Sequence, residues 1–178
     1  VGAEALIRWQ HPERGLVYPS EFIALCEECN LVTRLGEWVL DAVCRQQAAW
    51  REAGLQIVPV AINLAASHLC EENLPPLVAR TLKQFDIPAG LLEIEVTETV
   101  LLINPEESIR NAVALTQSGV RMALDDFGIG YSSLSYLKRL PVSALKIDRS
   151  FVRDLTTDAS DAAIITATLP IASLREHS

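Results

Sequence analysis

The chain has 178 residues, a formal net charge of −8 at neutral pH and 49% hydrophobic residues. This length suits a single domain, which would bury roughly 70% of the surface that its unfolded form exposes. The acidic balance argues against DNA or RNA as a partner, because nucleic-acid surfaces depend on clustered Lys and Arg.

The four cysteines all lie in the first half of the chain, in a spacing that is untidy for a secreted disulfide framework. No run of about 18 apolar residues is present that could span a bilayer. We therefore expect a domain of the reducing cytoplasm, although regions outside this chain could still anchor a full-length protein to a membrane. The cysteines are Cys26, Cys29, Cys44 and Cys70.

Short apolar runs alternate with amphipathic stretches, a pattern that predicts a repeat of strands and helices. The expected strands are residues 3–7, 57–64, 91–96, 121–124 and 144–147. The expected helices are residues 20–29, with Ser20 as N-cap, then 33–53, 75–85 and a helix capped by Asn104 that ends at Gly119. Strands joined by helices favour a parallel sheet.

Two adjacent carboxylates, Asp125 and Asp126, follow the apolar run 120–124 and open a loop that contains Gly128 and Gly130. Adjacent carboxylates repel each other and are costly to bury, so their place at the end of a predicted strand indicates a cation or a base as partner. They are the most informative feature of the sequence.

Polar side chains lie at or near the ends of all five predicted strands. They are Glu4, Asn63, Glu95, Asp125 and the pair Lys146 and Asp148. A site built from many strand ends is typical of a (β/α)8 barrel, whereas an open sheet gathers its ligands at one switch point. A complete barrel needs eight strands and typically about 250 residues, so we predict a partial TIM-like barrel with about five of its eight strands.

The segment 92–98 alternates apolar residues with Glu93 and Glu95. It is either an exposed edge strand, whose charges protect the edge, or one wall of an acidic cavity. In the second case the oxygen donors of the strand ends suit Mg²⁺ or Mn²⁺ better than metals that prefer thiolates.

Five segments in this order resemble the EAL domain family of bacterial cyclic di-GMP phosphodiesterases. They are Glu4-Ala5-Leu6-Ile7-Arg8-Trp9, the Asn63 strand, Glu95-Val96-Thr97-Glu98, Asp125-Asp126-Phe127-Gly128 and Lys146-Ile147-Asp148. The resemblance implies a modified TIM barrel that hydrolyses cyclic di-GMP to linear pGpG. It also implies a two-metal site of Mg²⁺ or Mn²⁺, which would lower the pKa of a bound water and stabilise the leaving 3′-oxygen.

The resemblance also implies a role for each matching residue. Glu4, Asn63, Glu95 and Asp125 would bind one metal ion, and Asp126 and Asp148 would serve the second. Lys146 would orient the attacking water, Arg8 would contact a substrate phosphate, and Leu6 would lie beside the nucleotide. Glu98 would anchor the loop of residues 127–133. Ile129 stands where the family usually has Thr, a change that we expect to be tolerated.

The family pattern includes segments that this chain lacks. A strand with Gln-Pro precedes the Glu-Ala-Leu motif, and strands with a Glu-Gly-Val-Glu pair and a Gln-Gly follow the last helix. We therefore expect residues 1–168 to form an incomplete EAL domain and 169–178 an atypical tail. The resemblance gives one of the missing glutamates the roles of metal ligand and general base, so we expect impaired activity, and marginal stability or association, from this chain alone.

Two other functions fit parts of the pattern. One is a degenerate module that binds cyclic di-GMP as a sensor without hydrolysing it. The other is a receiver-like phosphoacceptor, but a receiver has its acidic pair after the first strand, whereas Asp125 follows the fourth. The family resemblance further implies fusion to sensor or GGDEF modules and a possible homodimer.

Overall fold

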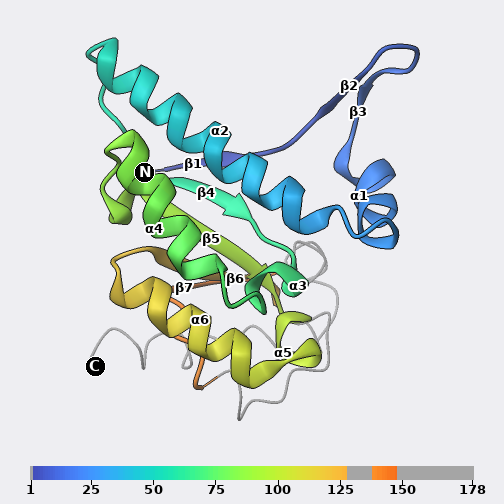
Figure 1. Ribbon diagram of the computed structural model, residues 1–178, viewed down its shortest axis with the longest axis vertical. Coiled ribbons are helices and arrows are strands. Elements are labelled where there is room, and N and C mark those ends of the chain that lie inside the picture. Colours follow the sequence, from blue (N-terminus) through green and yellow to red (C-terminus); the bar gives the residue numbers. More distant parts are fainter. Residues whose placement is uncertain (1, 128–137, 148–178) are drawn as a thin grey trace, which may run out of the picture.

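The computed structural model describes residues 2–127 and 138–147. Its centre is a parallel sheet with the strand order β1-β4-β5-β6-β7 (Figure 1). The strands are β1 (Ala3–Ala5), β4 (Val60–Asn63), β5 (Leu92–Thr97), β6 (Arg121–Phe127) and β7 (Ala144–Ile147). All four pairings are parallel, as the alternation of strands and helices predicted.

Helices cover one face of this sheet, where α2, α4 and α6 lie side by side (Figure 1). The helical elements are α1 (Pro19–Glu28), α2 (Val32–Glu52), α3 (Ala66–Leu69), α4 (Leu74–Phe85), η1 (Ala89–Leu91), α5 (Val100–Ile103) and α6 (Pro105–Gln117). Among the described residues, none of these helices is long and apolar enough to cross a membrane.

The hydrophobic core lies between the sheet and these helices. Every second residue of the central strands points into it, and Ile62, Ile94 and Met122 are at most 1% exposed. Leu74 of α4 and Leu115 of α6 close the same core from the helical side. The alternate residues therefore share the opposite face of the sheet, which is the concave side of a partial barrel.

The position of β5 excludes an edge strand for the acidic segment 92–98. Strand β5 lies between β4 and β6, so both of its edges are paired. The edge interpretation is therefore wrong, and Glu93 and Glu95 lie on the concave face. In the described part of the chain, the strands with only one neighbour are β1 and β7.

An antiparallel hairpin follows β1 and extends away from the sheet (Figure 1). It consists of β2 (Trp9–His11) and β3 (Gly15–Val17), and Gly15 allows its turn at a φ of 72°. The sequence analysis missed this hairpin because each strand has only three residues.

One helix prediction and one strand prediction need correction, and one cap is confirmed. Helix α1 begins at Pro19 with Tyr18 as N-cap, not at Ser20, because proline suits the first turn of a helix. Strand β6 continues to Phe127, past the predicted end at residue 124. The Asn104 cap is present, since the Glu107 amide donates to its Oδ1 at 3.3 Å.

Candidate functional site

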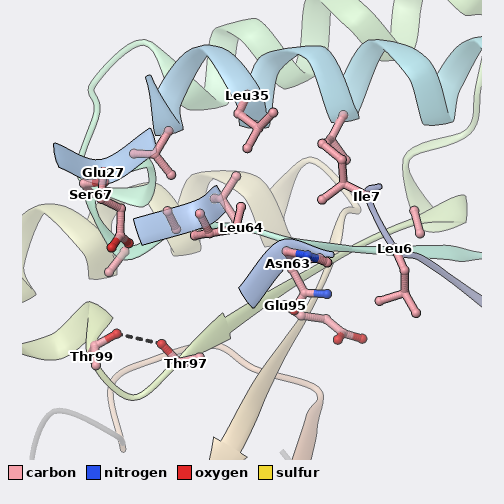
Figure 2. Close-up of a pocket in the computed structure, with 18 of the residues that line it drawn as sticks. Leu6, Ile7, Glu27, Leu35, Asn63, Leu64, Ser67, Glu95, Thr97 and Thr99 are labelled. Carbon is pink, nitrogen blue, oxygen red and sulfur yellow. Dashed lines mark hydrogen bonds between the residues drawn. The ribbon is translucent and has the colours of Figure 1, made fainter. Parts of the chain in front are cut away.

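One level of the concave face carries four residues in register. Asn63 is paired with Glu95, Glu95 with Ala123, and Ala123 with Ala144. Figure 2 shows Asn63 beside Glu95, with Leu6 at the same end of the cavity. The two alanines are the smallest side chains of this level.

Glu4 and Asn63 meet across the β1–β4 pair. The Asn63 Nδ2 donates to the Glu4 Oε1 at 2.9 Å, and both side chains are exposed. The parallel register places Glu4 beside Ala61, two residues before Asn63, so both residues face the concave side.

Lys146 and Glu95 form an ion pair that crosses β6. The Lys146 ammonium donates to the Glu95 Oε1, although their strands β7 and β5 are separated by β6. Ala123 is the β6 residue level with Glu95, and its methyl group leaves the path open. The Glu95 side chain is fully buried, and within the described part of the chain its Oε2 has no hydrogen-bond partner.

The pKa values of this pair reflect their surroundings. Burial raises the pKa of Glu95 above its ordinary value, and the charges of Glu4 and Asp125 add to the effect, while Lys146 opposes it. Burial by itself would lower the pKa of Lys146, but its bond to Glu95 and the nearby carboxylates outweigh burial and raise it. Lys146 is therefore a permanent cation among three carboxylates.

Asp125 and Asp126 lie at an irregularity of the β6–β7 pairing. The register shifts between Leu124 and Phe127, as in a β-bulge. Asp126 has a φ of 53°, and its amide donates to the Asp125 Oδ1 at 3.0 Å. This left-handed turn changes the direction of the backbone between the two carboxylates, which an ideal strand would place on opposite faces.

The remaining predicted residues lie around this group. Leu6 and Arg8 follow β1, and together with Glu4 they line a pocket of about 340 Å³ between β1 and α2. Glu98 is only 6% exposed, in the turn after β5. Asp148, most of the loop of residues 127–133 and the tail 169–178 lie outside the described residues.

A larger cavity of about 570 Å³ begins at Asn63 and Glu95 and continues beneath α1 and the start of α2 (Figure 2). Leu6 and Leu35 contribute apolar surface to it. The site therefore combines carboxylates with an apolar recess, an arrangement that suits a ligand with both charged and flat apolar parts.

The oxygen donors could hold a divalent metal ion. In the described part of the chain, no three Asp, Glu, His or Cys side chains already converge as a metal cage. Glu4, Asn63, Glu95 and Asp125 nevertheless supply only oxygen ligands and one neutral amide, and the unpartnered Oε2 of Glu95 is buried beside them. This chemistry fits Mg²⁺ or Mn²⁺.

Sequence analysis missed two residues that shape the site. Ala123 lets Lys146 reach Glu95, and Tyr18 lies under Arg8 with 4.8 Å between the guanidinium carbon and the ring centre. Ala123 was visible in the sequence only as a small residue within a predicted strand, which is a weak signal of a role in the site. Tyr18 gave no local signal, because its contact depends on the hairpin.

Comparison with known proteins agrees with this geometry. The model of the EAL domain matches residues 1–174. This chain belongs to the EAL domain family.

Two relatives from Pseudomonas aeruginosa are similar over almost the whole chain. The bifunctional diguanylate cyclase/cyclic di-GMP phosphodiesterase MucR is 42% identical over 94% of the chain and 24% of its own length. The cyclic di-GMP phosphodiesterase NbdA is 42% identical over 95% of the chain and 22% of its own length. The chain thus spans about a quarter of these relatives.

A solved structure of the PaMucR phosphodiesterase in its c-di-GMP complex superimposes with a TM-score of 0.87. It is 40% identical, and the match covers 97% of this chain and 70% of that one. The EAL resemblance and the partial TIM-like barrel are both confirmed by these matches.

Proposed function

We propose that this chain provides the metal-binding and substrate-binding part of a cyclic di-GMP phosphodiesterase, which opens the cyclic dinucleotide to linear pGpG. The observation that carries the proposal is the buried Glu95–Lys146 pair, set among oxygen donors from β1, β4 and β6. The named activities of MucR and NbdA support the same chemistry.

The proposed metal ligands are Glu4, Asn63, Glu95 and Asp125, with Asp126 and Asp148 at a second position. Divalent ions in this set would lower the pKa of a bound water and neutralise the phosphate oxygens, the chemistry of two-metal phosphodiesterases. Both Mg²⁺ and Mn²⁺ accept such oxygen ligands.

The other residues position the substrate. Lys146 is charged throughout the physiological range, because its pKa is raised, and it can donate a hydrogen bond that orients the attacking water. Arg8 contacts a substrate phosphate, and Leu6 packs beside the nucleotide. Glu98 anchors the loop that begins at Phe127.

The test is to incubate this chain with cyclic di-GMP and Mg²⁺ or Mn²⁺ and to separate the products by chromatography. Formation of the linear dinucleotide with metal, and its loss in Glu4→Ala, is the expected result for the phosphodiesterase. Linear product from Glu4→Ala at the parent rate would overturn the proposed metal site.

A second candidate function is a sensor that binds cyclic di-GMP without hydrolysing it. It is favoured by the solved PaMucR structure, which is 40% identical to this chain and is a c-di-GMP complex. The same experiment separates the two functions, since a sensor would retain the nucleotide intact after incubation.

The full-length protein is proposed to join this domain to sensor or GGDEF modules, as the bifunctional name of MucR suggests for that relative. We further propose a cytoplasmic domain that can form a homodimer. Sedimentation of the purified chain would test the dimer directly.

A further inference from the structure

The arginines of this chain fall into two groups by their partners. Five of the nine arginines that the structure describes pair with carboxylates, whereas Arg8, Arg34, Arg80 and Arg121 do not. The five pairs are Arg14–Glu21, Arg45–Asp41, Arg51–Asp86, Arg110–Glu107 and Arg139–Glu106. In an acidic protein, a cation held without a carboxylate remains available for an anionic ligand.

Arg8 is held by a neutral ring instead. Its guanidinium carbon lies 4.8 Å from the centre of the Tyr18 ring, within the range of a cation–π contact. Its Nη1 also donates to the Ile7 carbonyl at 2.8 Å. These two contacts restrict the side chain without neutralising its charge.

The backbone beneath the ring is fixed as well. Tyr18 is the N-cap of α1, and its carbonyl accepts a hydrogen bond from the Glu21 amide at 3.0 Å. Pro19 restricts the next φ angle, and Glu21 in turn pairs with Arg14 at 2.6 Å. Tyr18 therefore connects the fixed start of α1 to the Arg8 side chain.

The pocket places this arginine close to the proposed site. Arg8, Leu6 and Glu4 line the same pocket of about 340 Å³ between β1 and α2. An arginine oriented beforehand loses less conformational freedom when it binds a phosphate. We propose that Tyr18 is a positioning residue that holds Arg8 ready for the phosphate of the dinucleotide, an inference that rests on the proposed function.

The inference is tested by calorimetric titration of cyclic di-GMP into this chain with Mg²⁺, with chromatography to measure how much of the nucleotide is hydrolysed during the titration. Tyr18→Leu should raise the dissociation constant about three- to tenfold, the size expected from the loss of a cation–π contact. Tyr18→Phe keeps the ring and should stay within about twofold of the parent chain. Leu16→Ala, which removes another exposed apolar side chain of the hairpin, is the matched control.

A double substitution separates positioning from a general structural effect. In an Arg8→Ala background, Tyr18→Leu should cause no further loss of affinity, because the ring then has no arginine to hold. An equal loss in both backgrounds, or unchanged affinity of Tyr18→Leu alone, overturns the inference. Absence of binding by the unsubstituted chain overturns the proposed function itself, however the Tyr18 variants behave.

Discussion

Replacing Lys146 by Met tests the electrostatics of the site most sharply. The substitution leaves the Glu95 carboxylate buried without its cation, near Glu4 and Asp125. Removal of one partner from a fully buried pair costs about 3–5 kcal/mol. Because the Lys146 side chain is 39% exposed, water screens part of this interaction, and we expect a loss of about 2–3 kcal/mol in the free energy of unfolding.

The loss should depend on pH in a defined direction. The pKa of Glu95 is raised, so the folded chain binds the carboxyl proton more tightly than the unfolded chain does. As the pH rises and Glu95 ionises, the folded chain therefore loses stability. Without Lys146 the pKa rises further. The difference between Lys146→Met and the parent chain should therefore be larger at about pH 8 than at about pH 5.

Urea unfolding at both pH values measures this difference. Lys138→Met is the matched control, because Lys138 is exposed, and its free energy of unfolding should remain within about 0.5 kcal/mol of the parent. Adding Glu95→Gln to Lys146→Met should recover part of the loss at the higher pH. A loss below about 0.5 kcal/mol for Lys146→Met, or one that is equal at both pH values, would refute the reasoning.

Three further predictions concern packing near the site. Gly36→Ala should lower the free energy of unfolding in urea by about 1–3 kcal/mol, because the new Cβ would lie 2.4 Å from the His68 Nδ1. Gly90→Ala is the control, since its new Cβ would have its nearest atom at 3.9 Å. Equal losses in the two variants would contradict the clash. Burial lowers the pKa of His68, so the parent chain should lose stability as the pH falls through about 6.5. If His68→Gln leaves the pH dependence of stability unchanged, His68 is not its cause. Ala123→Leu should separate Lys146 from Glu95 and cost about 1–3 kcal/mol; a Tm equal to that of the parent would show that the path between them is not filled.

The sheet was predictable because its signals are local. The strands were indicated by short apolar runs or, for β5, by alternating apolar and acidic residues, and the polar residue near the end marks the carboxyl edge that parallel strands share. Glu4, Asn63 and Glu95 could therefore be grouped before their contacts were known. The pairing of Lys146 with Glu95 could not, because it depends on the size of Ala123 on the strand between them.

Helix α2 shows why a buried face is harder to predict. Its apolar residues form a broad surface that includes Trp38 and Trp50. The structure buries Leu40, Val43, Cys44 and Gln47 of this helix, while Trp38 is 60% exposed. Hydrophobic periodicity gives the width of an apolar stripe, but the neighbouring strand decides which part of it is covered.

The bulge at Asp125 and Asp126 was also beyond local sequence reasoning. Adjacent carboxylates indicated a site, yet the left-handed backbone of Asp126 arises where β6 loses register with β7. Such a shift is a property of two paired strands and not of one. The same applies to Tyr18, whose contact with Arg8 requires the hairpin to fold.

The central claim is that the oxygen donors at the strand ends bind cyclic di-GMP through a divalent cation. These donors are Glu4, Asn63, Glu95 and Asp125. The claim is tested most directly by titrating cyclic di-GMP into the chain with Mg²⁺ and with EDTA, and by repeating both titrations with Asp125→Ala. We expect tighter binding with Mg²⁺ than with EDTA, and loss of that metal effect in Asp125→Ala. Equal affinity in all four titrations would contradict it.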